Sequence, residues 1–493
     1  MLYMNMPTTP IRARNPRAFP RVVTCVLILL VTGILSMTAA AIATAIRRPP
    51  ADTQYRIYLR ADTAAHAVQV TAHIRWQAPQ SGICEIPFTF HPLAYAEDAP
   101  LPWDANDLSA AYPSGPDYAD TDLHHHSASV PAEWYTDRTD CRMLAKLQSP
   151  LRRGQSVDFL FVYTLRLPRT NLRLGYSDED MRLAQFYPQI CPWTQDGFLS
   201  VPYAPWGDPI VNECADYLVD VLLSDDYAVA ACGKIVSGIT DRPQVTFEAQ
   251  DIRDFALVIR RGTVWTDDYD GIALRYLPAD DPDPSATMER IKSILSVYES
   301  LWGYYPYESL SVTQAPFAAG GMEYGGMIVL AQGLSPAMHA TALAHEIAHQ
   351  WWYSDVGSDA YHTPWQDESL AQYATYRYFR AADMASFAQA FADAAKTQYT
   401  QYIQAHPERR GILSEPLDAY PNATDYVVLI YDKGLLLWLH LERQCGSDLV
   451  DRALRRYRSQ AAGTIASPET LLKALDDTRR GLDDILLAYA AQT

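Results

Sequence analysis

The chain has 493 residues, of which 48% are hydrophobic and 20% are charged, and its formal net charge is −18. These fractions are typical of a globular protein with sizeable cores, and they exclude a disordered chain. The length suggests about three domains. The excess of acidic residues also argues against nucleic acid as a partner, because an acidic surface repels the phosphate backbone.

An uncharged stretch at residues 22–46 dominates the amino-terminal region. As a helix it would be about 37 Å long, enough to cross a bilayer. Four arginines precede it and two follow it, which favours a cytoplasmic amino terminus and an extracytoplasmic remainder. We therefore expect a cytoplasmic basic segment at residues 1–21, a transmembrane anchor at residues 22–46 and a location in the cell membrane. A cleaved signal peptide, releasing a secreted protein, is the alternative, because small-residue runs lie near residue 40.

Seven cysteines are compatible with export. Cys25 lies in the apolar stretch and six others follow it. Six cysteines allow fifteen disulfide pairings, and the sequence does not choose among them. A bond between Cys84 and Cys141 would close one loop; buried free thiols are the alternative.

Residues 50–265 are expected to form a mostly antiparallel β domain. Hydrophobic residues alternate with polar ones at residues 55–59 and 68–76, which predicts strands of a half-buried sheet. Further strands are expected at residues 156–166, 217–223, 228–231, 245–248 and 255–259. Residues 92–135 have little periodicity and are expected to be a long irregular loop.

That expected loop carries three consecutive histidines, His124, His125 and His126. Because neighbouring side chains diverge on any backbone, we interpret them as surface residues rather than metal ligands. The aromatic-rich residues 186–193 and 206–209 either approach a functional site or fill the core, and we favour the core.

The pattern changes to helices over residues 266–493. Residues 277–285 interrupt the strands and supply an N-cap at Ser285 for a helix that ends at Gly303. Strands are expected at residues 310–313 and 328–331. After residue 382 the chain is expected to be almost entirely helical, so the fold class is α+β.

A metal-binding pattern lies in the run His345-Glu346-Ile347-Ala348-His349. Two histidines four residues apart lie on one face of a helix, where they can share a metal ion, and Glu346 is placed to reach a water molecule on it. Catalytic zinc needs a third protein ligand and an open position. Glu368 follows after eighteen intervening residues and opens a second helical stretch, which can return it to the histidine pair. The sequence therefore predicts one zinc ion per chain.

Two further stretches carry side chains suited to such a site. Gly320 and Gly321 precede Met322 and Glu323 and let the backbone approach another group closely. The Glu323 carboxylate can bind the free amino group of a peptide; a solvated residue of a glycine-rich turn is the alternative. Tyr431 lies in residues 431–434, early in a helix whose apolar run is expected at residues 435–441. Its hydroxyl can donate a hydrogen bond to an oxyanion; a packed aromatic residue is the alternative.

Together these motifs resemble the aminopeptidase N family of zinc metallopeptidases, the gluzincins. Residues 320–324 resemble the GxMEN exopeptidase motif, residues 345–352 the zinc helix, and residues 431–434 the tyrosine motif; Glu368 has the spacing of the third ligand. The resemblance covers about residues 50–493. It implies a saddle-like β-sandwich domain at residues 50–265, followed by a thermolysin-like, mainly helical catalytic domain at residues 266–493.

The resemblance also implies roles. His345, His349 and Glu368 would bind zinc, and Glu346 would act as general base and then proton shuttle. Glu323, with Gly321 and Met322, would hold the amino end of the substrate, and Tyr431 would stabilise the transition state. The expected function is a membrane-anchored aminopeptidase that acts on peptides with a free amino terminus. A zinc endopeptidase with an open cleft and a catalytically silent binding protein are the alternatives.

Three departures from the family pattern affect these expectations. The asparagine of GxMEN is Tyr324 here, and the usual Asn-Glu-Gly around the third ligand is Asp367-Glu368-Ser369. The family's large carboxyl-terminal helical domain is absent from this sequence. We therefore expect a more open site, or one that another subunit or a partner covers.

Overall fold

The computed structural model describes residues 52–99, 101, 105–204, 206–223, 226–237, 244–411 and 415–492. The predicted anchor at residues 22–46 and Cys25 lie outside these residues. No helix within the described ranges is long and apolar enough to span a bilayer.

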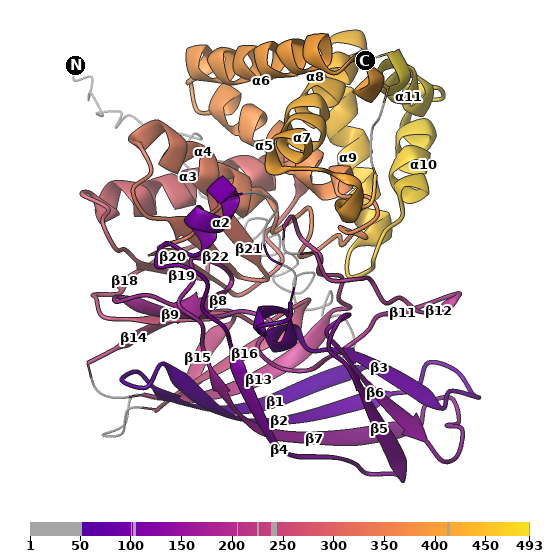
Figure 1. Ribbon diagram of the computed structural model, residues 1–493. Coiled ribbons are helices and arrows are strands. Elements are labelled where there is room, and N and C mark those ends of the chain that lie inside the picture. The colour runs from indigo at the N-terminus through magenta and orange to yellow at the C-terminus, as the bar shows by residue number, and fades with distance from the viewer. Residues whose placement is uncertain are drawn as a thin grey trace, which may run out of the picture. The chain divides into compact units, whose positions relative to one another are not determined.

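A seven-stranded sheet forms the base of the amino-terminal half (Figure 1). Its strand order is β15-β16-β13-β1-β2-β7-β4, and only the pairing of β1 with β13 is parallel among these neighbours. Along β1 and β2 nearly every second side chain is buried, which is the predicted alternation. The strands are β1 (Thr53–Asp62), β2 (Ala67–Gln77), β4 (Asp120–Ala128), β7 (Ser156–Arg166), β13 (Ala215–Leu222), β15 (Lys234–Ser237) and β16 (Gln244–Ile252).

The prediction of an irregular loop at residues 92–135 is wrong. This region contains η1 (His91–Tyr95), α2 (Ala105–Ala111), β4 and β5 (Ala132–Asp137). His124 to His126 lie on β4, an edge strand with no fully buried side chain, which therefore lacks the apolar alternation on which the prediction relied. The histidines are at the surface, as expected: His124 Nε2 lies 2.9 Å from the hydroxyl of Thr164.

Smaller sheets complete the β-rich half. One has the order β10-β3-β6-β5, a second has the order β14-β17-β9-β8, and β11 pairs with β12. Their remaining strands are β3 (Glu85–Thr89), β6 (Arg142–Leu147), β8 (Leu174–Tyr176), β9 (Asp180–Leu183), β10 (Gln189–Ile190), β11 (Trp193–Thr194), β12 (Gly197–Phe198), β14 (Ala228–Ala231) and β17 (Leu257–Arg260). The six cysteines of the described residues are free thiols, and Cys84 is not bonded to Cys141. Only Cys141, Cys191 and Cys232 are buried, so the alternative of buried free thiols holds for three of the six.

A five-stranded mixed sheet separates two hydrophobic cores. Its order is β18-β19-β20-β22-β21, with β21 at the edge. One face contributes Leu310 and Ile328 to the core shared with the helices, and the other contributes Met322 and Tyr324 to the core of the β-rich half. The strands are β18 (Trp265–Tyr269), β19 (Ile272–Leu277), β20 (Ser309–Ala315), β21 (Gly321–Tyr324) and β22 (Met327–Ala331). The division at residues 265/266 stays a prediction.

Helices make up most of the remaining chain, and α5 to α11 gather on the side away from the seven-stranded sheet (Figure 1). The predicted N-cap at Ser285 is wrong: Asp283 accepts a hydrogen bond from the amide of Ala286, and the helix begins at Pro284. The helices are α3 (Pro284–Trp302), α4 (Pro336–Ala348), α5 (Trp365–Ala381), α6 (Ala385–Ala405), η2 (Pro407–Arg409), η3 (Leu417–Ala419), α7 (Ala423–Tyr426), η4 (Val427–Asp432), α8 (Lys433–Cys445), α9 (Ser447–Ala461), α10 (Pro468–Thr478) and α11 (Leu482–Gln492).

Candidate metal centre

Helices α4 and α5 carry the three predicted metal ligands. Ser335 caps α4 by accepting a hydrogen bond from the amide of Met338, and Pro336 occupies its first turn. The helix buries its apolar face in the core, which leaves His345 and His349 near its end facing α5. Glu368 lies in the first turn of α5, as the antiparallel arrangement predicted.

The ligand atoms of these residues lie at the corners of a small triangle. His345 Nε2 is 3.1 Å from His349 Nε2 and 3.1 Å from Glu368 Oε2, and His349 Nε2 is 3.4 Å from the same oxygen. Zinc–ligand bonds of about 2.0–2.1 Å at tetrahedral angles place neighbouring ligand atoms about 3.3–3.4 Å apart. Two imidazoles and a carboxylate at this spacing therefore fit a zinc ion.

Neighbouring groups orient the ligands. His349 Nδ1 lies 2.9 Å from the carbonyl oxygen of Trp352, which as acceptor leaves Nε2 free for a metal. The other oxygen of Glu368, Oε1, accepts a hydrogen bond of 2.6 Å from the hydroxyl of Tyr431. Burial would raise the pKa of the Glu368 carboxyl group, but the charges and hydrogen bonds of His349 and His345 hold that pKa well below its usual range. Glu368 is thus kept ionised, as a metal ligand must be.

Glu346 points from α4 toward β21. Burial raises the pKa of its carboxyl group to about 8. A Cβ atom at Gly321 would overlap that carboxyl group, so the absence of a side chain at Gly321 allows the strand to lie directly against Glu346.

Strand β21 places Glu323 in the same site. Because side chains alternate along a strand, Met322 and Tyr324 enter the core of the β-rich half while Glu323 faces α4. Ligand atoms of Glu323, Glu346 and His349 lie within 4.8 Å of one another. Gln350 ties the strand to the end of α4, because its amide donates to the carbonyl of Tyr324 and its oxygen accepts from the amide of Gly326.

The residues that depart from the family pattern are turned away from the metal ligands. Tyr324 is 2% exposed and lies in the core, so its ring does not enter the site. Asp367 accepts a hydrogen bond of 2.7 Å from the hydroxyl of Ser358, and burial raises the pKa of its carboxyl group to about 7. The hydroxyl of Ser369 accepts a hydrogen bond of 2.9 Å from the indole of Trp438.

Tyr431 lies in η4, a π-helical turn, and not in the apolar helix itself, which begins two residues later as α8. Such turns are frequent at functional sites. The Tyr431 ring stacks on the imidazole of His345, with ring centres 5.8 Å apart. The phenol therefore lies beside the predicted metal position.

Sequence reasoning missed Asp208 and Arg173. Phe186 and Tyr187 fill the core as expected, whereas Asp208, in the second aromatic-rich stretch, lies close enough to Glu368 and His349 for their charges to interact. Arg173 pairs with Asp208. An acid within an aromatic-rich segment was the only signal in the sequence, and nothing in its spacing pointed to the metal centre.

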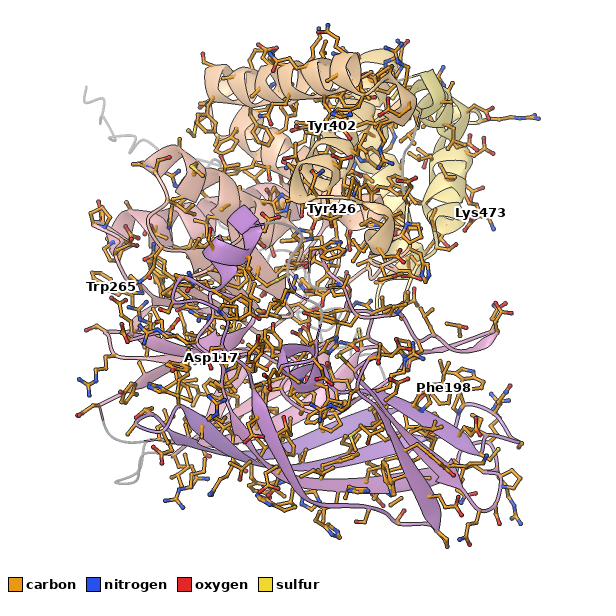
Figure 2. All side chains as sticks on the ribbon, in the orientation of Figure 1. Asp117, Phe198, Trp265, Tyr402, Tyr426 and Lys473 are labelled. Atoms are coloured by element: carbon orange, nitrogen blue, oxygen red, sulfur yellow. The ribbon has the colours of Figure 1, made fainter. Side chains whose placement is uncertain are left out.

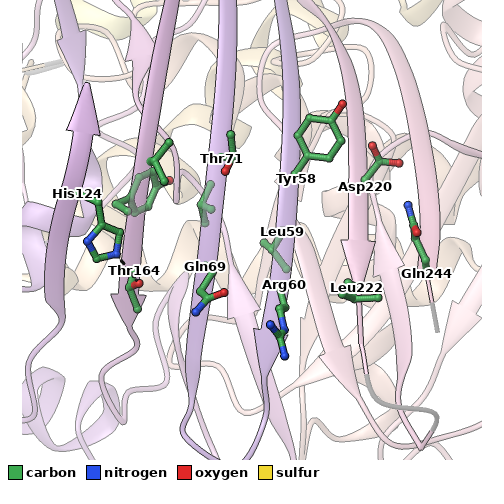
Figure 3. A pocket seen from close by; sticks show the side chains of 13 residues that line it. Tyr58, Leu59, Arg60, Gln69, Thr71, His124, Thr164, Asp220, Leu222 and Gln244 are labelled. Carbon is green, nitrogen blue, oxygen red and sulfur yellow. Dashed lines mark hydrogen bonds between the residues drawn. The ribbon is translucent and has the colours of Figure 1, made fainter. Parts of the chain in front are cut away.

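A cavity of about 550 Å³ lies elsewhere, on the exposed face of the seven-stranded sheet. Figure 3 shows Tyr58, Gln69, His124 and Asp220 along its strands. None of the predicted site residues lines this cavity, so it is separate from the chemistry of the metal centre.

Comparison with known proteins finds similarity to one family of peptidases. Residues 286–489 match the peptidase family M1 domain. A membrane alanyl aminopeptidase of Heliothis virescens is 29% identical over 189 residues, which are 34% of this chain but only 18% of that protein. The match thus spans less than a fifth of that relative.

Solved structures share the fold. An M1 zinc metallopeptidase of Deinococcus radiodurans superposes with a TM-score of 0.62 at 15% identity, covering 90% of this chain and 95% of that one. A variant of that enzyme bound to a Tyr-Ser-Ala substrate has the same TM-score, identity and coverage. The fold is therefore the α+β fold of these enzymes, with a β-rich amino-terminal part and a helical carboxyl-terminal part. Residues 286–489 thus match an M1 peptidase domain that contains the His-His-Glu metal site, and the chain is similar to the aminopeptidase N-like zinc metallopeptidases.

Proposed function

We propose that the chain is an aminopeptidase, which removes single residues from peptides with a free amino terminus. The observation that carries this proposal is the position of Glu323. Glu323 is 5% exposed, and its carboxyl group lies within 4.8 Å of ligand atoms of His349 and Glu346. A carboxylate so close to a metal ligand can hold an ammonium group only one residue away from the bond that is cut.

The names of similar proteins support the same substrate class. The Heliothis relative is named a membrane alanyl aminopeptidase, and the solved Deinococcus variant holds a tripeptide substrate. Both facts describe those proteins, and for this chain they add weight to an exopeptidase acting on peptides.

The proposed mechanism assigns each group a step. His345, His349 and Glu368 would hold a zinc ion, which would supply Lewis acidity to the scissile carbonyl and to the attacking water. Glu346 takes a proton from the attacking water and later returns it to the leaving amine. Tyr431 donates a hydrogen bond to the oxyanion of the transition state. Glu323 holds the α-ammonium group in place, assisted by the backbone at Gly321 and Met322.

The decisive experiment compares alanyl p-nitroanilide with its N-acetylated form, using zinc-loaded residues 50–493. An aminopeptidase cleaves the free form and leaves the acetylated form intact. Glu323→Gln should raise KM for the free form at least tenfold with unchanged zinc content, whereas the exposed Glu133→Gln should change nothing. Equal cleavage of both forms by the unchanged protein would favour the zinc endopeptidase instead. Bound zinc without any turnover would favour a binding protein.

We also infer membrane anchoring through residues 22–46, with the metal centre outside the cytoplasm. The uncharged stretch and the arginines that precede it support this location. The full chain should stay with membranes through an alkaline carbonate wash, and added protease should reach the enzyme in intact cells. Recovery of the full-length chain in the wash would contradict the anchor. A second subunit or a partner over the site remains part of the proposal, and the mass of the detergent-solubilised protein tests it.

A further inference from the structure

Arg173 and Asp208 form an ion pair beside the metal centre that the mechanism above does not use. Arg173 directly precedes β8, and Asp208 belongs to the connection between β12 and β13. Their side chains are 20% and 14% exposed. Neither residue is near the other in sequence, so the pair joins two separate segments of the β-rich half.

The Arg173 guanidinium holds three segments together. Nε donates to the sulfur of Met322 at 2.9 Å, which reaches strand β21 next to Glu323. Nη2 donates to the carbonyl oxygen of Gly207 at 2.6 Å and also to the carboxylate of Asp208. One side chain thereby fixes residues 206–208 relative to the strand that carries Glu323.

Residues 206–208 are also fastened on the helical side. The indole of Trp206 donates a hydrogen bond of 2.9 Å to the carbonyl of Leu417. Gly207 has φ +58°, and a Cβ there would lie 2.7 Å from Leu417 Cδ2 and 3.4 Å from Tyr426 Cζ. Figure 2 places Tyr426 among the helices, on the side toward the strands. The segment therefore crosses between the two halves next to the metal centre.

The charges around the site explain why a cation is needed here. Asp208 lies close enough to Glu368 and His349 for their charges to interact, and its charge also acts on Glu323 and Glu346. The guanidinium of Arg173 pairs directly with Asp208 and so offsets the negative charge nearest to it.

We propose that Arg173 is a positioning residue for the amino end of the substrate. It fastens residues 206–208 to β21 and neutralises Asp208, so that Glu323 is the carboxylate left for the α-ammonium group. Arg173 touches neither the zinc ligands nor the scissile bond. This inference rests on the proposed aminopeptidase function and explains what holds its amine-binding carboxylate in place.

The test measures kcat and KM of zinc-loaded Arg173→Met for alanyl p-nitroanilide and its N-acetylated form. We expect KM for the free form to rise about tenfold with a smaller change in kcat, and the preference for the free form to fall. Arg169→Met is the matched control. Arg169 lies four positions before Arg173 in the sequence and makes an ion pair with the exposed Asp178. Zinc content should be unchanged in both variants.

Two further variants separate positioning from general damage. Arg173→Lys keeps the charge and should recover part of the lost preference. Adding Asp208→Asn to Arg173→Met should cost no further kcat/KM, because both residues act through one ion pair. An unchanged KM and preference in Arg173→Met, an equal loss on both substrates, or additive losses in the double variant would overturn the inference. If the unchanged protein cleaves the free and the N-acetylated substrate equally well, that result contradicts the proposed aminopeptidase function. It is distinguished from a failure of this inference, which shows only in the variants.

Discussion

The hydroxyl of Tyr431 donates a hydrogen bond to Glu368 Oε1 at 2.6 Å, while Glu368 Oε2 faces both His345 and His349. The two oxygens of one carboxylate thus have different partners. One oxygen is presented to the metal position, and the other holds the phenol at the edge of the site. This arrangement couples the third ligand to the group that we propose as the oxyanion donor.

Replacing Tyr431 by Phe removes the hydroxyl and keeps the ring that stacks on His345. We expect kcat to fall about 10²- to 10³-fold, the size of effect seen when an oxyanion donor is lost, with KM and zinc content little changed. Steady-state kinetics and metal analysis measure this. A raised KM at unchanged kcat would instead show that Tyr431 serves substrate binding.

Glu346→Gln tests the general base. The amide fills the same space beside Gly321 but cannot accept a proton from water. We expect turnover to fall by at least about 10³-fold, with zinc bound at one ion per chain. Glu299→Gln in helix α3, where the carboxylate accepts hydrogen bonds from the hydroxyl of Tyr269 and the amide of Tyr305, is the control for carboxylate loss. Turnover retained in a zinc-loaded Glu346→Gln protein would remove Glu346 from that role.

Gly434→Ala tests the close approach of α8 to α5. A Cβ at Gly434 would lie 2.6 Å from Ser369 Cβ and 3.1 Å from Ser369 Cα. We expect a loss of about 1–3 kcal/mol in the free energy of unfolding, as overpacking produces, and weaker zinc binding because Glu368 precedes Ser369. Denaturant unfolding and zinc titration measure both effects. Adding Ser369→Gly to Gly434→Ala should restore part of the lost stability. If Gly434→Ala alone does not destabilise the protein, the steric argument is refuted.

The sequence was sufficient to predict strands and metal ligands where the pattern depends on residues close together in the chain. The spacing of His345, His349 and Glu368 depends on one helix face and one antiparallel turn, so those residues meet as predicted. Strand β7 was found because every second residue along it is buried, and β14 because its four residues form a short apolar run. Edge strand β4 was missed because burial does not mark either of its faces.

Asp208 and Arg173 were out of reach for a different reason. Each is brought to the site by contacts between segments far apart in the chain, such as the bond of Trp206 to Leu417. Contacts between segments that are distant in the chain leave no periodic pattern in the sequence. The orientation of Tyr324 was also undetermined, because only the pairing of β21 with β22 settles which of its faces meets the helix.

Removing zinc should destabilise the folded protein. Without the ion, Asp208, Glu323, Glu346 and Glu368 face one another in a largely buried site. A ligand that binds only the folded state stabilises it by about 4 kcal/mol at a thousand times its Kd. We expect a chelator to lower Tm and added zinc to restore it. The zinc-dependent shift should vanish in His345→Ala and persist in His124→Ala, which alters an exposed histidine on β4; a shift retained in His345→Ala would contradict the assigned ligand.

Lys433 gives the chain a predictable response to alkaline pH. The side chain is fully buried, and its ammonium group donates to the carbonyl of Ala490 in α11 at 3.1 Å. Burial lowers the pKa of this amine from 10.5 to about 8. Between those values the unfolded chain keeps the proton and the folded chain releases it, so raising the pH favours folding.

The wild-type protein should therefore gain stability relative to Lys433→Met between about pH 8 and 10.5, by at most roughly 3 kcal/mol. Below pH 8 both states carry the proton and the difference between the proteins stays constant. Urea unfolding at pH 7, 8, 9 and 10, with zinc present, measures this. Lys473→Met on α10, where the side chain is exposed (Figure 2), should show no such trend. A constant difference for Lys433→Met across this range would mean that the buried amine stays charged, held by its hydrogen bond to α11.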